Sequence, residues 1–322
     1  MRRLLLTVAT LFLVACSTPP VAPSFRVALV TPGSIADAAW NSGAYAGLLQ
    51  VRDSLGASIS NVEARSPAEQ EEALRSYAAQ GYDLVFGHGF EFQGLAERVS
   101  ADFPKTVFVI TSGERVAGKV APMIFNIEEA TYLGGMAAGG MTRSNVIGFV
   151  GGIQLPPIER GATGWANGAK AVNPRVQSRV TYLNSFDDAA AGKEQALALI
   201  HAGVDVLTHN ADAAALGLFQ AVKENSGVLV VGANADQSAL APGQVLGSAV
   251  LDLPRAFLLV GREVKGHTFT PRIEAFGLAS GVVRFDWDTT VAKRVPAALR
   301  ARIAAARDSI AAGTLRPLDP TH

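Results

Sequence analysis

The sequence has few of the residues from which metal sites and catalytic centres are commonly built. It contains one cysteine and five histidines in 322 residues, and the histidines show no paired ligand spacing. The 28 basic residues balance the 28 acidic ones, so there is no excess of positive charge for binding nucleic acid. There is no dinucleotide fingerprint, Walker A sequence, Gly-x-Ser-x-Gly elbow or His-Glu-x-x-His pair. We therefore expect no cofactor, no metal and no nucleic-acid partner.

The N-terminus has the layout of a leader peptide. Met1-Arg2-Arg3 is basic, an apolar stretch follows, and Leu13-Val14-Ala15-Cys16 closes it. The apolar stretch is too short to span a bilayer as a mature helix, which favours a signal peptide over residues 1–15. Small residues before a cysteine resemble a bacterial lipobox, in which the cysteine is acylated and becomes the new N-terminus. The alternative is an ordinary secreted protein with a chance cysteine at position 16.

Lipidation of Cys16 would leave no free thiol in the mature chain. Disulfides, thiolate metal sites and cysteine nucleophiles would then be excluded in an exported compartment. Residues 16–24 contain Pro19, Pro20 and Pro23 and are predicted to form a short lipidated tether. The protein would lie in the cell envelope, anchored on the extracytoplasmic side of an inner or outer membrane. The remaining length of about 300 residues exceeds what one core usually supports and indicates two domains.

From Phe25 onward, short β-branched runs alternate with longer amphipathic ones, which predicts an α/β fold with mostly parallel sheets. The pattern passes through roughly four strand–helix units and restarts near Val146, so two similar lobes are expected. The predicted strands are Phe25 to Val30, Ala57 to Val62, Leu84 to His88, Val107 to Ser112, Val146 to Val150, Gln177 to Tyr182, Val204 to His209 and Val228 to Gly232.

Helices are predicted between these strands. Ser66-Pro67-Ala68-Glu69 marks one start, because it combines an N-cap hydroxyl, a proline in the first turn and a capping-box glutamate. Asp187-Asp188 is interpreted as a cap at another helix start. The other predicted helices are Asp37 to Ser54, Phe92 to Asp102, Glu128 to Met141, Glu159 to Val172, Asp187 to Ala202, Ala213 to Lys223, Pro254 to Val264 and Pro296 to Ala312.

The loops that follow the strands are the expected place for a site, since ligands of such sheets bind beyond the carboxyl ends of the strands. His88 and His209 both end predicted strands, so one hypothesis brings them together as metal ligands or as an acid and a base. The other interpretation is that they are hydrogen-bonding groups near a ligand or ordinary buried polar residues. The loops are Thr31 to Ala36, Gly87 to Phe92, Ser112 to Glu114, Gly151 to Arg160, His209 to Asp212 and Ala233 to Ser238.

Several collinear segments resemble the basic membrane protein family. They are Tyr82 to Phe90, Glu128 to Gly135, Ile147 to Gly152, Gly164 to Pro174, Gly232 to Gln237 and the terminal helix around Val295 to Pro317. Members of this family are similar to the purine nucleoside receptor of spirochaetes, a lipoprotein that serves as the binding component of an ABC transporter. The resemblance implies a type I periplasmic-binding fold, with two Rossmann-like lobes joined by a hinge. It implies binding and closure on a solute, with an ABC permease as partner, rather than enzyme activity.

The resemblance also implies how the chain is divided. We expect an N-terminal lobe of residues 25–126 plus 253–280 and a C-terminal lobe of residues 127–252 plus 281–322. The three hinge crossings are then expected near Phe125 to Glu128, Val250 to Pro254 and Phe276 to Val283. A monomer is expected.

The pocket of the family is replaced here at most positions. Pro32 stands for an acid, Ile35 for an aromatic residue, Ala36 for an asparagine and Leu251 for a lysine, and Ser112 replaces the aspartate that ends the fourth strand. Asp236 alone keeps the carboxylate that contacts ribose in the family. From this placement, the candidate ligand-binding residues are Ser34, Trp40, Phe90, Ser112, Asn210, Asp212 and Asp236.

A nucleoside or nucleobase-like solute is the leading prediction, because aromatic faces suit a base and amide or carboxylate groups suit its edge and the ribose hydroxyls. Trp40 and Phe90 are the aromatic residues nearest the expected cleft, although a tryptophan on an amphipathic helix is more often part of the core. The alternatives are an exported enzyme and a ligand-sensing lipoprotein that acts on a different small polar solute.

Overall fold

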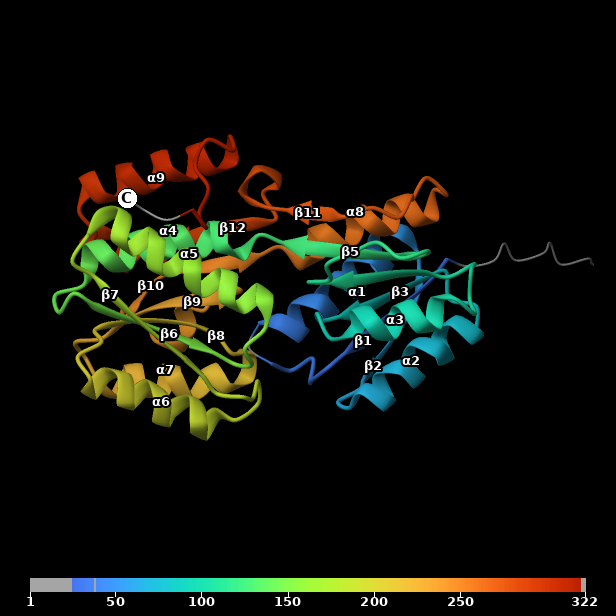
Figure 1. Ribbon diagram of the computed structural model, residues 1–322, viewed down its shortest axis with the longest axis horizontal. Helices are drawn as coiled ribbons and strands as arrows, with labels where there is room; N and C mark the ends of the chain where they lie inside the picture. The colour runs from blue at the N-terminus through green and yellow to red at the C-terminus, as the bar shows by residue number, and fades with distance from the viewer. Residues whose placement is uncertain (1–24, 38, 320–322) are drawn as a thin grey trace, which may run out of the picture.

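The computed structural model describes residues 25–37 and 39–319 and has two α/β lobes side by side (Figure 1). The first lobe has a sheet of order β11-β5-β4-β3-β1-β2, and the second has a sheet of order β12-β10-β9-β8-β6-β7. The first sheet contains β1 (Arg26–Thr31), β2 (Ser58–Glu63), β3 (Leu84–His88), β4 (Val107–Thr111), β5 (Val120–Phe125) and β11 (Glu274–Phe276). The second contains β6 (Val146–Gly151), β7 (Gln177–Tyr182), β8 (Val206–Asn210), β9 (Leu229–Asn234), β10 (Val245–Leu251) and β12 (Val283–Trp287).

The two sheets repeat one strand order, which confirms the predicted pair of Rossmann-like lobes. Neighbouring strands pair in parallel throughout the first sheet. In the second sheet only β12 runs antiparallel, against β10. In both sheets the strand order reverses beside the first strand of the lobe. Strand β1 lies between β2 and β3, and β6 lies between β7 and β8. This reversal opens a crevice at the carboxyl ends of the strands.

Helices cover both faces of each sheet. In the first lobe, α1 (Trp40–Leu55) and α8 (Leu253–Lys265) share a core on one face, and α2 (Pro67–Ala79) and α3 (Phe92–Ser100) share another. In the second lobe, α4 (Ile127–Met141), α5 (Pro156–Val172) and α9 (Ala297–Ala311) cover one face, and α6 (Ala189–His201) and α7 (Ala215–Glu224) cover the other (Figure 1). Short 3-10 turns at Asp212–Ala214, Ser238–Leu240, Leu278–Ser280 and Val291–Arg294 complete the described elements.

The predicted helices and strands are present with shifts of a few residues at their ends. The capping box at α2 is confirmed, since Ser66 Oγ accepts from the Glu69 amide at 3.3 Å and Glu69 Oε2 accepts from the Ser66 amide at 2.9 Å. Strands β5, β10, β11 and β12 were not predicted. Strand β5 contains Pro122, and a proline inside an apolar run argues against a central strand when only the sequence is considered. Strand β11 has only three residues.

The chain crosses between the sheets three times, and the crossings lie against one another. They are β5 to α4, β10 to α8, and β11 to β12. The Asn126 amide donates to the Phe276 carbonyl at 2.9 Å, and the Asp252 amide donates to the Val282 carbonyl at 2.7 Å. Each pair of neighbouring crossings is therefore linked through the backbone.

Helices α4 and α5 pack backbone against backbone through glycine. A Cβ atom added at Gly135 would lie 2.1 Å from the Trp165 carbonyl oxygen, and one at Gly168 would lie 1.9 Å from the Tyr132 carbonyl oxygen. No side chain fits in such a gap, so glycine at these positions sets the distance between the helices. Helix α5 begins at Pro156, shortly after β6 ends at Gly151 beside the crevice. The contact with α4 therefore also helps to position the start of α5.

Candidate solute-binding site

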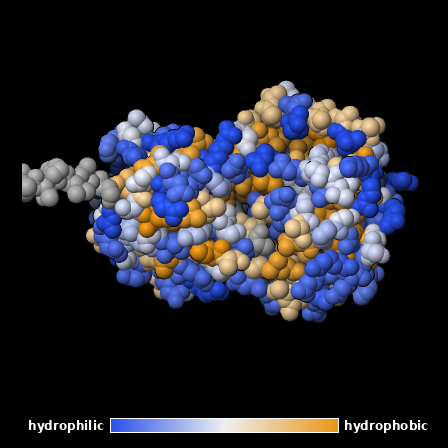
Figure 2. Space-filling view, turned by 180° about the vertical axis from the view of Figure 1, so that it is seen from behind, coloured by the Kyte–Doolittle hydropathy of each residue, from blue (hydrophilic) through white to orange (hydrophobic). Residues whose placement is uncertain are grey.

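A cleft that is open to solvent lies between the two lobes. The surface narrows to a waist there, with apolar side chains showing in the gap (Figure 2). Its lining is mostly aromatic and aliphatic, with a few polar groups. The lining residues are Pro32, Trp40, Gly89, Phe90, Glu91, Ser112 and Phe125 from the first lobe and Ile127, Leu155, Pro157, Ile158, Phe186, Asn210, Asp212, Asn234 and Leu251 from the second.

The cleft lies where the topology requires it. Its residues end or follow strands β1, β3, β4 and β5 of the first sheet and strands β6 to β10 of the second. Each of the six loops expected from the sequence to surround a ligand supplies at least one lining residue. Residues distant in the chain therefore meet because they all occupy the carboxyl edge of a parallel sheet.

Three lining residues have an unusual backbone conformation. Ser112, Asp212 and Asn234 have φ angles of 59°, 45° and 66°, and they are among six described non-glycine residues with positive φ. Residues other than glycine rarely adopt this region, and asparagine and aspartate tolerate it best. Backbone strain of this kind concentrates at ligand sites, where the surrounding structure holds it in place. All three residues stand at strand ends that face the cleft.

The structure brings together five of the seven predicted site residues. Trp40, Phe90, Ser112, Asn210 and Asp212 line the cleft. Ser34 is not among the lining residues, and its Oγ accepts from the Ala36 amide at 3.1 Å within a local turn. Asp236 is also absent from the lining; it is exposed, and its Oδ1 accepts from the amide of Ser238 at 3.0 Å and from its hydroxyl at 2.6 Å.

Trp40 is held at the cleft by a buried histidine behind it. The two rings stack with centroids 4.1 Å apart, and His88 Nε2 lies 3.1 Å from the Trp40 carbonyl oxygen. Because a carbonyl only accepts, Nε2 carries the proton, and Thr111 Oγ1 then donates to Nδ1 at 2.9 Å. Burial lowers the pKa of His88 to about 3, so the ring is neutral. Trp40 was expected either to belong to the core or to line the cleft, and it does both.

A second buried histidine braces the loops of the other lobe. His209 Nε2 lies 2.8 Å from Gln237 Oε1, which also accepts from the Ala233 amide at 2.8 Å. The Gln237 amide in turn donates to Ser248 Oγ at 3.2 Å. Burial lowers the pKa of His209 to about 4. Gln237 therefore links the ends of β8 and β9 to the middle of β10. Asn210 ends β8, and Asn234 ends β9.

The hypothesis that His88 and His209 meet as ligands or as an acid–base pair does not hold. Each is fully buried in its own lobe, and neither lines the cleft. Across residues 25–37 and 39–319, no group of three or more His, Cys, Asp or Glu side chains could hold a metal ion. The two histidines act as internal supports for the cleft walls.

Sequence reasoning missed several lining residues, and some of them carried a signal. Asn234 ends a strand inside the quoted segment Gly232 to Gln237, and Glu91 directly follows Phe90 in a predicted loop. Phe186 had no signal of its own, because it follows β7 within a turn of polar residues. Phe125 and Ile127 lie in a predicted crossing between the lobes, and Leu251 was noted only as the replacement of a lysine in the family pocket.

Two carboxyl groups, one from each lobe, line the cleft. Asp212 is 9% exposed, and burial raises its pKa well above the usual range, with the charges of Asp37, Glu91 and Asp187 adding to the effect. Glu91, the carboxyl from the first lobe, is exposed. The Asp37 carboxylate already accepts hydrogen bonds from the start of α1. Its Oδ2 accepts from the Asn41 backbone amide at 2.6 Å, and its Oδ1 accepts from the Ser42 backbone amide at 2.8 Å.

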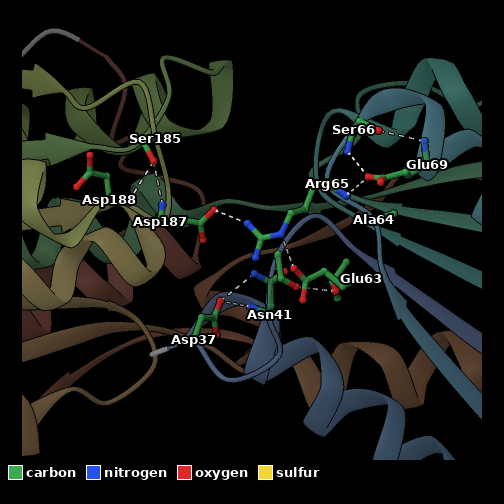
Figure 3. Close-up of polar contacts among 12 residues, drawn as sticks. Asp37, Asn41, Glu63, Ala64, Arg65, Ser66, Glu69, Ser185, Asp187 and Asp188 are labelled. Carbon is green, nitrogen blue, oxygen red and sulfur yellow. Dashed lines mark hydrogen bonds and ion pairs between the residues drawn. The ribbon is translucent and has the colours of Figure 1, made fainter.

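One ion pair joins the lobes across the mouth of the cleft. Arg65 Nη1 of the first lobe lies 3.3 Å from Asp187 Oδ2 of the second, and Arg65 Nε pairs with Glu63 at 2.6 Å (Figure 3). Asp188, next to Asp187, caps α6 by accepting from the Ala191 amide at 2.9 Å. The expected helix cap is therefore Asp188, and Asp187 points toward the opposite lobe.

Comparison with known proteins assigns this architecture. Residues 25–312 match the family model described as ABC transporter substrate-binding protein PnrA-like. The chain belongs to this family. Basic membrane protein A1 of Borrelia garinii subsp. bavariensis is 28% identical over 274 residues, which cover 81% of this chain and 79% of the relative. The resemblance to the basic membrane protein family, inferred from the sequence, is confirmed.

Solved solute-binding proteins share the fold of this family member. An ABC transporter solute-binding protein from Aeropyrum pernix K1 superposes with a TM-score of 0.83 at 22% identity, covering 91% of this chain and 92% of that one. A second, from Conexibacter woesei, gives 0.73 at 29% identity, with 91% and 98% covered. The family and these structures are solute-binding proteins and not enzymes, so the alternative of an exported enzyme is set aside. Of the helices described, none has the length and apolar character to cross a membrane.

Proposed function

We propose that this substrate-binding protein captures a nucleoside or nucleobase-like solute and presents it to an ABC permease. The supporting observation is the composition of the cleft, which has aromatic side chains from both lobes and polar groups at its edges. A flat heterocycle fits between apolar walls of this kind.

The polar groups suit the edge of a base and a ribose. Asn210 and Asn234 offer both donors and acceptors, and Ser112 offers a hydroxyl from the opposite lobe. Trp40 and Phe90 come from the first lobe and Phe186 from the second, so a bound ring would touch both lobes. Ser34 and Asp236 stay predicted contacts, which closure of the lobes would have to bring to the ligand.

Closure is the proposed mechanism. The moving units are residues 25–126 plus 253–280 and residues 127–252 plus 281–322, turning about the three adjacent crossings. A solute that touches both walls binds the closed form more tightly than the open one, and this difference in affinity drives the change. The permease then recognises the closed form.

The proposal includes a lipid anchor at Cys16 on the extracytoplasmic side of the membrane, and a monomeric state. Cys16 and the predicted tether lie outside the described residues. Nine residues from 16 to 24 span at most about 30 Å when fully extended, which would keep the first lobe close to the bilayer. Metabolic labelling with a radioactive fatty acid tests the anchor, with Cys16→Ser as the variant expected to lose the label.

Thermal shift across nucleosides, bases, sugars and amino acids tests the ligand class. A ligand at 100 times its dissociation constant adds about 2.7 kcal/mol to stability, which raises the melting temperature clearly. We expect nucleosides to give the shift and Asn210→Ala to reduce it. Asp236→Ala separates two outcomes: a lost shift makes its carboxylate a ligand contact, and an unchanged shift makes it only a turn residue. A shift with sugars or amino acids alone would refute the nucleoside proposal.

A further inference from the structure

Asp212 is a buried carboxylate with no protein partner among the described residues. Its side chain lines the cleft, the residue is 9% exposed, and no hydrogen bond or ion pair to it occurs within residues 25–37 and 39–319. It also has a φ of 45°, so the backbone holds it in a conformation that most residues avoid. A buried charge without a partner is strongly destabilising, and folded proteins rarely keep one without a function.

The neighbouring charges do not neutralise Asp212. The Asp37 carboxylate accepts amides at the start of α1, and Asp187 is paired with Arg65 across the cleft mouth. Arg65 is shared with Glu63, so it is not free to balance a further carboxylate. The nearby acidic groups raise the negative potential at Asp212 instead of relieving it.

Glu91 adds a second carboxylate to the same cleft from the opposite lobe. It lines the cleft beside Phe90, and the only hydrogen bond to its carboxylate among the described groups comes from its own backbone amide. Asp212 and Glu91 interact electrostatically across the gap. When both groups are ionised they repel each other, and a cation between them would favour the ionised form of both and remove this repulsion, which a neutral solute cannot do.

The aromatic walls complete a site for a cation. Trp40, Phe90 and Phe186 line the cleft together with Asp212 and Glu91. Aromatic ring faces attract positive charge, by about 0.5–2 kcal/mol depending on solvent exposure. A positively charged flat ring would stack on such walls, satisfy the two carboxylates and remove the repulsion that opposes closure.

We infer that the solute is a cationic heterocycle, within the proposed nucleoside-like class, whose positive ring is bound between Asp212 and Glu91. The inference rests on the proposed function for the ribose and the nucleoside outline, but the charge requirement follows from the two carboxylates. The positive charge serves affinity and closure together, because only the closed form places both carboxylates against the ring. A nucleoside alkylated on a ring nitrogen has this chemistry.

Calorimetry with two matched pairs of probes tests the inference. The first pair is adenosine and 1-methyladenosine, and the second is nicotinamide and 1-methylnicotinamide, which lack the ribose. We expect 1-methyladenosine to bind at least tenfold more tightly than adenosine. Asp212→Asn, which keeps the shape and removes the charge, should abolish the preference, while Asp308→Asn, an exposed carboxylate on α9, should retain it.

The outcomes separate the two proposals. Equal or tighter binding of adenosine overturns the charge requirement and leaves the nucleoside proposal standing. Binding of 1-methylnicotinamide alone, lost in Asp212→Asn, supports the cationic site and refutes the nucleoside outline. If neither cation binds, or if Asp212→Asn binds the cations as tightly as the wild type does, the inference is wrong.

Discussion

At the scale of single residues, the cleft depends on groups placed under strain or deprived of partners. Ser112, Asp212 and Asn234 hold positive φ angles at strand ends, and Asp212 is also a buried carboxyl with no partner in the part of the chain that the structure describes. Such features lower the stability of the empty protein, and proteins retain them at sites where activity depends on them. The same residues should therefore be ones where substitution stabilises the fold and weakens ligand binding.

Asp212→Asn should stabilise the protein without ligand at pH 8. Burial raises the pKa of Asp212 in the folded state, so stability falls as pH rises from the usual aspartate pKa through the raised one. Each unit of elevation contributes about 1.4 kcal/mol of destabilisation above that range, which asparagine removes. Urea unfolding at pH 8 and pH 4 measures this. The stabilisation should shrink at pH 4, and a wild type that is more stable than the variant at pH 8 would contradict it.

The buried histidines should make the protein sensitive to acid. His88 and His209 have pKa values lowered to about 3 and about 4, whereas the unfolded chain takes up protons near pH 6.5. Stability is therefore complete above that pH and is lost below it, by about 1.4 kcal/mol per pH unit for each ring. His209→Gln retains a donor toward Gln237 and does not titrate. Between pH 6 and 5, the free energy of unfolding should fall less in His209→Gln than in the wild type, by about 1.4 kcal/mol. Equal slopes would show that His209 is not buried in its neutral form.

At the scale of elements, close helix pairs determine where the loops of the site begin. Gly135 and Gly168 let α4 and α5 touch through their backbones, and a Cβ at Gly192 would lie 2.0 Å from the Ala214 carbonyl oxygen where α6 meets the turn after Asp212. The start of α5 and the turn at Asp212 both border the cleft. The distances between helices therefore set the positions of lining residues that belong to neither contact.

Gly168→Ala should destabilise the second lobe. The new Cβ would lie 1.9 Å from the Tyr132 carbonyl oxygen, so α4 and α5 must move apart, at a cost of about 1–3 kcal/mol or more. The matched control is Gly94→Ala in α3, where the only atom near the new Cβ is Arg98 Nη1 at 3.9 Å. The control should be neutral or gain about 0.5–1 kcal/mol from helix propensity. Chemical unfolding compares the two, and similar stabilities would argue against backbone contact in α4 and α5.

Elements with a clear period or cap could be predicted from the sequence, and those defined by tertiary contacts could not. The predicted bounds of Leu84–His88 and Gln177–Tyr182 match; the first is a short, mostly apolar run, and the second contains the β-branched residues Val180 and Thr181. Strand β5 contains Pro122, and β11 is too short to show a pattern. The site followed the same division. Asn210 and Asp212 stand in a predicted loop, whereas Phe125 and Ile127 became lining residues only through a crossing between the lobes.

At the scale of the whole molecule, the two lobes are joined by adjacent crossings on one side and, among the described residues, by one ion pair across the mouth of the cleft. The crossings are linked by backbone hydrogen bonds, and Phe125 and Phe276 stack there with ring centroids 6.1 Å apart. The pair between Arg65 and Asp187 is 59% exposed on both partners. Exposed pairs contribute about 0–1 kcal/mol, so this contact can bias closure without locking it.

Arg65→Ala should weaken ligand binding with little loss of stability. Removing the cross-lobe partner of Asp187 favours the open form by less than about 1 kcal/mol, equivalent to no more than about fivefold in affinity. The control is Arg75→Ala, which removes an exposed pair with Asp102 inside the first lobe. Calorimetry with the solute found by thermal shift compares the variants. An equally large loss of affinity in the control would show that the ion pair between Arg65 and Asp187 plays no part in closure.

The lack of cysteine in the described chain allows closure to be measured directly. With Cys16 replaced by serine, Glu72→Cys on α2 and Glu194→Cys on α6 place two spin labels on exposed sites, one on each lobe and on the same side of the molecule (Figure 1). Double electron–electron resonance then measures the distance between lobes with and without the solute found by thermal shift. The account predicts a shorter, narrower distribution with saturating solute, and less shortening in Asp212→Asn. A distribution unchanged by a solute that calorimetry shows to be bound would contradict capture by closure.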